Sequence, residues 1–393
     1  MSIAVKDGKI FYKGAFSDLD ILLDNGKIEK IGKNLKGDEN CSAKGMLVLP
    51  GLIDPHVHLR DPGATEKEDF HTGTRAAVAG GFTTVMDMPN NPIPTTTVLR
   101  LREKLNLARK KAVCNVLFHF GATDGNFGDI MEARPRSLKI YLGKTTGELF
   151  LRSPTSLERH FQNYDGHFFF HADSSSGDEQ QQLDETCKNI VEIGKLSERY
   201  SRKSHIAHAS AGKVIELSKS LGLTVEVPPH YLFLDNKDAK KLGYLGTVYP
   251  ALRSDKIRKT LWEKVKKADC IATDHAPHTL EDKKEGAHGF PGLETSLGMM
   301  LSAYHAKKLE LGWIVERMSE KPADIFGLAG VGRINEGHSA DLAIVDLKKE
   351  WKVKGEELYT KCKWSPFEGK KLKGRVKSVF FNGKLIFDNY EFS

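Results

Sequence analysis

The stretch GLIDPHVHLRDPG, residues 51–63, contains two histidines, His56 and His58, that are separated by one residue. If this segment is a strand, the alternation of its side chains places Asp54, both histidines and Arg60 on one face. Two imidazoles at a strand end could form half of a metal site, and the neighbouring guanidinium could bind an anion. Two core histidines with local hydrogen bonds would produce the same pattern, so the two histidines alone leave both interpretations open.

Residues of metal-ligand types recur in other apolar segments further along the chain. They are Lys139 in LKIYLG, His171 in HFFFHAD, His208 in SHIAHAS and Asp274 in ATDHAPH. Imidazole nitrogens and a carboxylate oxygen suit zinc or a similar divalent ion. Lys139 does not fit this pattern, because a protonated ammonium is disfavoured beside a metal cation. An unmodified lysine there should be neutral or point away.

Eight short apolar segments alternate with mostly helical connections through the middle of the chain. The segments are residues 47–59, 82–90, 115–124, 137–143, 167–173, 204–210, 223–233 and 270–278. Eight such βα units predict an α/β fold of the (β/α)8 TIM-barrel type, in which functional residues lie at the carboxyl ends of the strands. A doubly wound sheet is the structural alternative, but no G-x-G-x-x-G or G-x-x-x-x-G-K-[ST] motif follows any of these segments.

Both ends of the chain have the pattern of β-structure. Asp7-Gly8, Asn25-Gly26 and Asn382-Gly383 each lie between strand-like stretches, which is typical of hairpin turns. We therefore predict a small β-sandwich domain built from both termini. The expected division is residues 1–50 and 335–393 for the β-sandwich and 51–334 for the catalytic barrel.

Composition excludes several classes of protein. Lysine and arginine exceed aspartate and glutamate by 7, and the densest basic stretch, residues 369–377, has no accompanying aromatic platform. A solvated hairpin edge therefore explains it better than a nucleic-acid surface. The 5 cysteines are widely spaced and odd in number, which argues against a disulfide framework and a thiolate zinc site. No signal peptide or apolar run of about 18 residues is present, so we expect no membrane association and a cytoplasmic protein.

Seven motifs together resemble the dihydroorotases of the amidohydrolase superfamily over nearly the whole chain. They are PGLIDPHVHLRDPG (50–63), MPNNP (88–92), LKIYLG (138–143), EVPPHYLFL (226–234), ATDHAPHT (272–279), GFPGLET (289–295) and KWSPFEGKKLKGRV (363–376). The H-x-H motif and the late aspartate are shared with hydantoinases and allantoinases. HLRDPG, DHAPHT and GFPGLET are more diagnostic of dihydroorotases.

The resemblance implies a centre with two divalent metal ions, zinc being the expected metal. It implies that one ion is held by His56, His58 and Asp274 and the other by His171 and His208. N6-carboxylation of Lys139 would convert this cation into an anionic oxygen ligand that bridges the two ions, with a hydroxide as the second bridge. Asp274 would also be the catalytic residue that moves the proton between this hydroxide and the substrate nitrogen.

The resemblance also implies which residues bind the substrate. Arg60, Asn90 and His278 would bind a carboxylate, and the loop at Pro291 and Gly292 would contribute backbone groups. On the residues alone, Asn90 could equally be a turn-former before Asn91-Pro92.

Several further positions receive weaker expectations. Thr145 matches a position that could close over the substrate, whereas Tyr249 lies in a stretch that departs from the family pattern and is not included. Ala207 precedes His208, so the cysteine-supported extra metal site of some relatives has no thiolate here. Glu226 could hydrogen-bond to a ligand histidine.

The implied activity is the reversible cyclisation of N-carbamoyl-L-aspartate to L-dihydroorotate and water in de novo pyrimidine (UMP) biosynthesis. The implied partners are this small-molecule substrate pair and either a second copy of the chain or aspartate carbamoyltransferase. An allantoinase or hydantoinase is the alternative enzyme, although a substrate without a carboxylate would leave Arg60 without an anion. An inactive homologue acting as a scaffold is a third hypothesis, which the complete set of ligand positions disfavours.

Overall fold

The computed structural model describes residues 1–143 and 149–392, and its central part contains two parallel sheets. The first sheet has the order β10-β9-β8, with β8 (Leu52–Val57), β9 (Phe82–Asp87) and β10 (Asn115–Phe118). The second sheet contains β11 (Phe120–Gly121), β12 (Ser137–Tyr141), β13 (His167–His171), β14 (Ser204–Ile206) and β15 (Thr224–Val225), side by side in that order. Every strand pair in both sheets is parallel, which confirms the predicted α/β class.

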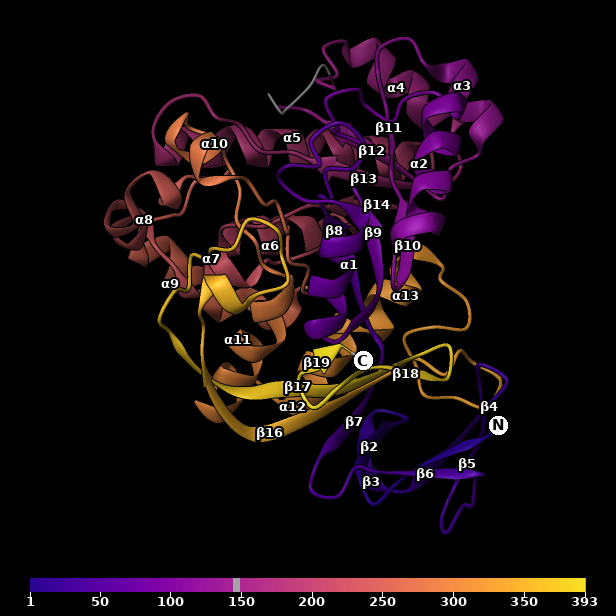
Figure 1. Ribbon diagram of the computed structural model, residues 1–393. Helices are drawn as coiled ribbons and strands as arrows, with labels where there is room; N and C mark the ends of the chain where they lie inside the picture. Colours follow the sequence, from indigo (N-terminus) through magenta and orange to yellow (C-terminus); the bar gives the residue numbers. More distant parts are fainter. Residues whose placement is uncertain (144–148, 393) are drawn as a thin grey trace.

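Helices lie around the parallel sheets (Figure 1), some between successive strands and the others after β15. They are α1 (Phe70–Ala79), α2 (Val98–Lys111), α3 (Phe127–Ala133), α4 (Pro154–Asn163), α5 (Glu179–Arg199), α6 (Gly212–Ser220), α7 (Pro229–Phe233), α8 (Asn236–Leu242), α9 (Asp255–Lys264), α10 (Leu280–Lys284), α11 (Leu293–His305), α12 (Leu311–Met318) and α13 (Glu320–Phe326). Three short 3-10 helices cover Gly243–Gly246, Val265–Lys267 and Gly355–Glu357. Local sequence starts several helices: Asp69 and Asp178 form capping boxes that begin α1 and α5.

The strand pairing brings the carboxyl ends of distant segments to one edge. Tyr141 at the end of β12 is in register with His171 at the end of β13. The eighth predicted segment, 270–278, contains no assigned strand, but isolated parallel bridges join Cys270 to Glu226 and His275 to Val57. Residues 270–275 therefore lie between Glu226, which directly follows β15 of the second sheet, and β8 of the first sheet.

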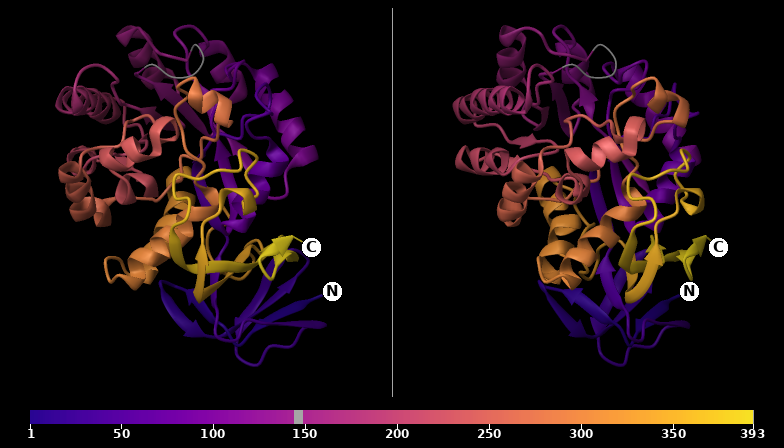
Figure 2. Two further views of the ribbon diagram at one scale, coloured as in Figure 1. Left: turned by 60° about the vertical axis from the view of Figure 1, so that its left-hand side comes forward. Right: turned by 90° about the vertical axis from the view of Figure 1, so that its left-hand side faces the viewer.

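Strands from both termini lie together at one end of the molecule, as both views of Figure 2 show. A four-stranded sheet has the order β5 (Lys27–Gly32), β4 (Asp20–Asp24), β1 (Ile3–Lys6) and β6 (Glu39–Ser42). A seven-stranded sheet has the order β19 (Glu391–Phe392), β18 (Lys384–Asp388), β17 (Lys371–Phe381), β16 (Leu342–Lys352), β7 (Leu47–Pro50), β2 (Lys9–Tyr12) and β3 (Ala15–Asp18). One apolar cluster contains buried side chains from both sheets, among them Val5, Ile21, Val48 and Ile344.

Two of the three predicted hairpin turns are confirmed. Asn25-Gly26 joins β4 to β5, and Asn382-Gly383 joins β17 to β18. The prediction for Asp7-Gly8 was wrong, because β1 pairs with β4 and β6 whereas β2 pairs with β3 and β7. Val5 and Ile10 on either side of this turn both enter the shared apolar cluster, so the turn carries the chain across the core from one sheet to the other.

Among the helices of residues 1–143 and 149–392, none combines the length and the apolar composition that crossing a membrane requires.

Candidate metal centre and active site

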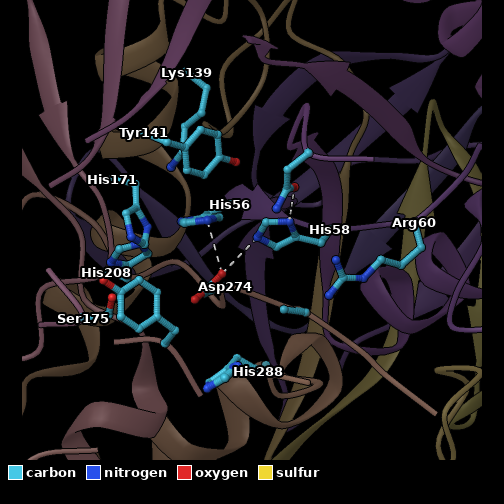
Figure 3. Close-up of a pocket in the computed structure, with 14 residues that line it drawn as sticks. His56, His58, Arg60, Lys139, Tyr141, His171, Ser175, His208, Asp274 and His288 are labelled. Carbon is cyan, nitrogen blue, oxygen red and sulfur yellow. Dashed lines mark hydrogen bonds and ion pairs between the residues drawn. The ribbon is translucent and has the colours of Figure 1, made fainter. Parts of the chain in front are cut away.

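Three of the predicted metal ligands meet at a single carboxylate oxygen. Asp274 Oδ1 lies 3.2 Å from Nε2 of His56 and 3.2 Å from Nε2 of His58. The ligand atoms of these three buried residues all lie within 4.8 Å of one another. Figure 3 shows both imidazoles pointing toward Asp274. The i, i+2 spacing of the histidines at the end of β8 therefore directs both rings to one point.

The other predicted ligands lie beside this group. Nδ1 of His171 lies 2.8 Å from Nε2 of His208, and the His56 and His208 ring centroids are 5.4 Å apart. Lys139 is fully buried, its Nζ lies 4.1 Å from the centre of the Phe169 ring, and Figure 3 shows its amine directed toward the histidines. The structure thus brings all six predicted ligand positions into one region.

Unsatisfied polar atoms allow a test of whether these residues suit a metal. Lys139 Nζ and His171 Nε2 are buried and have no hydrogen-bond partner in residues 1–143 and 149–392. Isolated buried donors and acceptors of this kind are costly, and they are commonly explained by an ion or another ligand. The nitrogen and oxygen donors are those that zinc-like ions prefer, so the residues fit a metal centre.

The protonation of these groups also suits ligation. Burial lowers the pKa of His58 to about 3 and the pKa of His171 well below its usual value, so both imidazoles are neutral. Burial would raise the pKa of Asp274, but the neighbouring His56 and the hydrogen bond from His58 lower it below its usual value. Burial lowers the pKa of Lys139 to about 7, which makes a neutral amine accessible near neutral pH. A neutral amine is the form that can react with carbon dioxide.

Three of the site residues have left-handed backbone conformations. The φ angles are +63° for Arg60, +36° for His208 and +49° for Asp274. Such conformations are uncommon for residues other than glycine, and they cluster at functional sites where the surrounding structure enforces them. In this chain the three left-handed residues lie at the ends of three different apolar segments, and each carries a predicted site side chain.

Glu226 is buried, and it forms the expected hydrogen bond to one of the predicted ligand histidines. Its Oε1 contacts Nδ1 of His56 and accepts the backbone N–H of His208 at 3.1 Å. Its Oε2 lies 3.2 Å from Nε2 of His205. His205, Glu226 and Cys270 form a second buried group of potential ligand atoms, although Glu226 already binds His56.

The three residues predicted to bind the substrate carboxylate each contact another site residue. They are Arg60, His278 and Asn90. Arg60 Nη2 lies 3.1 Å from Nε2 of His278, and Arg60 Nε donates to the carbonyl of Pro277 at 3.1 Å. Asn90 Oδ1 lies 2.7 Å from Nδ1 of His58, so the asparagine also contacts a predicted metal ligand. In Figure 3, Arg60 lies on the opposite side of His58 from Lys139.

A cavity of about 370 Å³ joins the ligand residues to Arg60 and Asn90. Residues that the sequence reasoning missed also line it: Tyr141, Ser175, Tyr249, Ala276, His288 and Gly289. Tyr141 follows Lys139 by two residues on a strand, so the alternation of side chains could have identified it. The others come from loops whose path no local pattern reveals.

Some predicted positions are not among the residues that line this cavity. Pro291 and Gly292 border two smaller voids instead, and the Gly292 N–H donates to Nδ1 of His275 at 3.1 Å. His278 does not line the cavity, but its Nε2 contacts two residues that do, Arg60 and the carbonyl of His288. Thr145 lies outside the described residues, so its predicted role as a lid remains a prediction.

The comparisons with known proteins agree with this geometry. The model of the Amidohydrolase family matches residues 47–152 and 168–386. The dihydroorotase of Thermococcus kodakarensis is 38% identical over 394 residues, which cover 98% of this chain and 95% of that protein. The dihydroorotase of Pyrococcus abyssi is 39% identical over 399 residues, with the same shares of the two chains covered.

A longer protein and a solved structure are also similar to this chain. The multifunctional protein CAD of Squalus acanthias is 37% identical over 361 residues, which are 89% of this chain and 15% of that protein. The structure of an L-hydantoinase (dihydropyrimidinase) from Arthrobacter aurescens has a TM-score of 0.93 at 26% identity and covers 100% of this chain and 97% of that one. The chain belongs to the amidohydrolase family and, within it, to the dihydroorotases.

Proposed function

We propose that this chain catalyses the reversible cyclisation of N-carbamoyl-L-aspartate to L-dihydroorotate and water, a step of pyrimidine biosynthesis. The observation that carries the choice of substrate is Arg60. Its side chain is only 8% exposed, lines the same cavity as His56, His58 and Asp274, and forms no ion pair within residues 1–143 and 149–392. A buried guanidinium without an anion is costly, so a carboxylate on the substrate would complete the site.

A cyclic amide hydrolase of hydantoinase or allantoinase type is the second candidate, since an L-hydantoinase shares the fold. A hydantoin ring lacks the carboxylate that Arg60 requires. The identity to dihydroorotases also extends over nearly the full chain, which supports the first candidate.

We propose that two divalent ions, most simply zinc, occupy the centre. His56, His58 and Asp274 would hold one ion, His171 and His208 the other, and an N6-carboxylated Lys139 would bridge them. When bound, such ions acidify water and polarise the carbonyl under attack. The neutral imidazoles of His58 and His171 and the buried amine of Lys139 support this assignment.

The protein's own groups orient the substrate and move a proton. Arg60 would bind the carboxylate with its two terminal nitrogens, and Asn90 and His278 would complete this contact. Asp274, whose pKa is low, would accept a proton from water in ring opening and return it to the leaving nitrogen. The loop at Pro291 and Gly292 would contribute backbone groups to substrate binding, which the position of the preceding residues His288 and Gly289 in the cavity lining supports.

We also propose that the eight parallel segments close into a (β/α)8 barrel over residues 51–334. The bridges of Cys270 to Glu226 and of His275 to Val57 support closure between the two parallel sheets. Residues 1–50 and 335–393 would form the β-sandwich domain, which the apolar cluster shared by the two terminal sheets supports.

Partners and location are further proposals. The similarity to a segment of a multifunctional protein supports association with aspartate carbamoyltransferase, and a homodimer is the alternative. The five unpaired cysteines support a reducing, cytoplasmic location.

The decisive experiment measures metal content and the consumption of L-dihydroorotate by the purified protein, with Arg60→Ala alongside. We expect bound divalent metal, turnover of dihydroorotate, and a large increase in KM for Arg60→Ala. Arg333→Ala, in which an arginine paired with Asp324 is removed, serves as the control. Activity on hydantoin or allantoin without activity on dihydroorotate would contradict the proposal.

A further inference from the structure

A lysine and an aspartate form a fully buried ion pair behind the side of the cavity that contains Arg60 and Asn90. Lys104 Nζ on α2 lies 2.7 Å from Oδ2 of Asp87 at the end of β9, and the two side chains are 0% and 1% exposed. Neither residue lines the cavity. Isolated pairs of this kind contribute little net stability against an apolar replacement, so a positional role is a reasonable explanation for the pair.

Lys104 contacts the chain on both sides of Asn90, at Met88 and at Asn91. Its Nζ donates to the carbonyl of Met88 at 2.7 Å and to Oδ1 of Asn91 at 2.8 Å. These acceptors lie on either side of Asn90, in the loop that leaves β9. One ammonium therefore determines where the backbone of Asn90 lies.

The same network reaches the chain on either side of Arg60. Asp87 Oδ1 accepts the backbone N–H of Leu59 at 2.7 Å, and Asn91 Nδ2 donates to the carbonyl of Pro62 at 3.1 Å. Arg60 lies between these two contacts with a left-handed φ of +63°. External hydrogen bonds are the means by which a structure holds such a conformation, since local backbone preference opposes it.

We propose that Asp87, Lys104 and Asn91 form a positioning network that sets the distance between Arg60 and Asn90 and so selects a substrate carboxylate. The two substrate-facing residues come from different strands, β8 and β9, and the network joins the loops that follow both strands. This inference rests on the proposed dihydroorotase activity. Its residues act through Arg60 and Asn90 and are not themselves catalytic.

The test compares the metal-loaded parent protein with Lys104→Met and with the double variant Asp87→Asn/Lys104→Met, which leaves no buried charge unpaired. A change that removes binding common to the ground state and the transition state raises KM and leaves kcat unchanged. We expect KM for L-dihydroorotate to rise about tenfold or more, with kcat within about threefold of the parent and the metal content unchanged. Lys219→Met, which breaks the Lys219–Asp269 pair on the outer side of the molecule, is the matched control and should leave KM unchanged.

The outcomes separate this inference from the proposed function. A folded double variant whose KM stays within about twofold of the parent, or one that loses kcat at constant KM, overturns the network proposal while leaving the proposed function intact. A parent protein that neither binds nor turns over dihydroorotate overturns both.

Asn91→Ala provides a second route in case the Lys104 variants do not fold. This change keeps the Asp87–Lys104 pair and removes only the links of Asn91 to Lys104 and Pro62. A severalfold increase in KM with normal kcat and metal content supports the proposal. An unchanged KM in Asn91→Ala overturns it.

Discussion

One carboxylate oxygen of Glu226 contacts ligands from both halves of the candidate metal centre: it bonds to the His56 ring and accepts the backbone N–H of His208. The first contact places the ring proton of His56 on Nδ1 and directs its Nε2 lone pair toward Asp274. The second holds the left-handed backbone of His208. Glu226 therefore determines both the tautomer of one ligand and the position of the other.

Glu226→Gln should weaken metal binding, because an amide supports the His56 proton less strongly than a carboxylate does. Loss of such an outer partner typically lowers metal affinity by about tenfold to a hundredfold. Competition with a chelator measures the change, and Glu216→Gln, on the outer helix α6, serves as the control. Equal affinity of the Glu226→Gln and parent proteins would contradict this role.

Lys139→Ala should lose bound metal and nearly all activity if a carboxylated lysine bridges the ions. Metal analysis and turnover of dihydroorotate measure both effects. Lys195→Ala, whose side chain is 66% exposed, is the control. Growth or incubation with isotope-labelled bicarbonate should give a carbamate carbon signal in the parent that the variant lacks. A Lys139→Ala protein with full metal content and rate would refute the bridge.

Asp274→Asn should lower kcat per bound metal by about a hundredfold to ten-thousandfold, the range typical of general acid–base catalysis. The amide keeps an oxygen near His56 and His58 but cannot accept the proton from water. Steady-state kinetics on metal-quantified protein measure this loss. Asp269→Asn, which alters the Lys219 pair, should retain the parent rate. More than about a tenth of the parent kcat in Asp274→Asn would show that the proton moves by another route.

The buried carboxyl group of Asp341 should lower the free energy of unfolding as pH rises. The residue is 4% exposed, and burial raises its pKa to about 6 although the N–H of Asn382 donates to it. A raised carboxyl pKa means that the folded state binds the proton more tightly, so this contribution is present below about pH 4 and is lost as pH rises through 6.

Asp341→Asn should remove this loss, since the amide carries no charge at any of these pH values. Relative to the parent, the variant should gain up to about 3 kcal/mol of unfolding free energy between pH 4 and pH 8. Urea unfolding at both pH values measures the difference, with Asp24→Asn, at the half-buried last residue of β4, as the control. The same pH dependence in both proteins would assign the effect to other groups.

The sequence alone identified five of the six predicted metal ligands, because each has a ligand-type side chain in a short apolar segment that can be read locally. Parallel pairing then brings the ends of these segments together, as Tyr141 and His171 show. The family resemblance was needed to interpret Lys139, because the chemistry of an unmodified lysine argues against a role in metal binding. The resemblance also identified Arg60 and Asn90 as expected substrate contacts, and the structure shows that both line the cavity.

The tertiary structure decided what depends on contacts between residues that are distant in the sequence. Glu226 is 170 residues from His56, and no local pattern indicates that their side chains meet. Asp7-Gly8 resembles a hairpin locally, yet the shared apolar core draws its two strands into different sheets. Residue types and spacing thus determined which chemistry this chain can perform. Packing and loop paths decided how the reacting groups are oriented, because side-chain direction depends on neighbours from elsewhere in the chain.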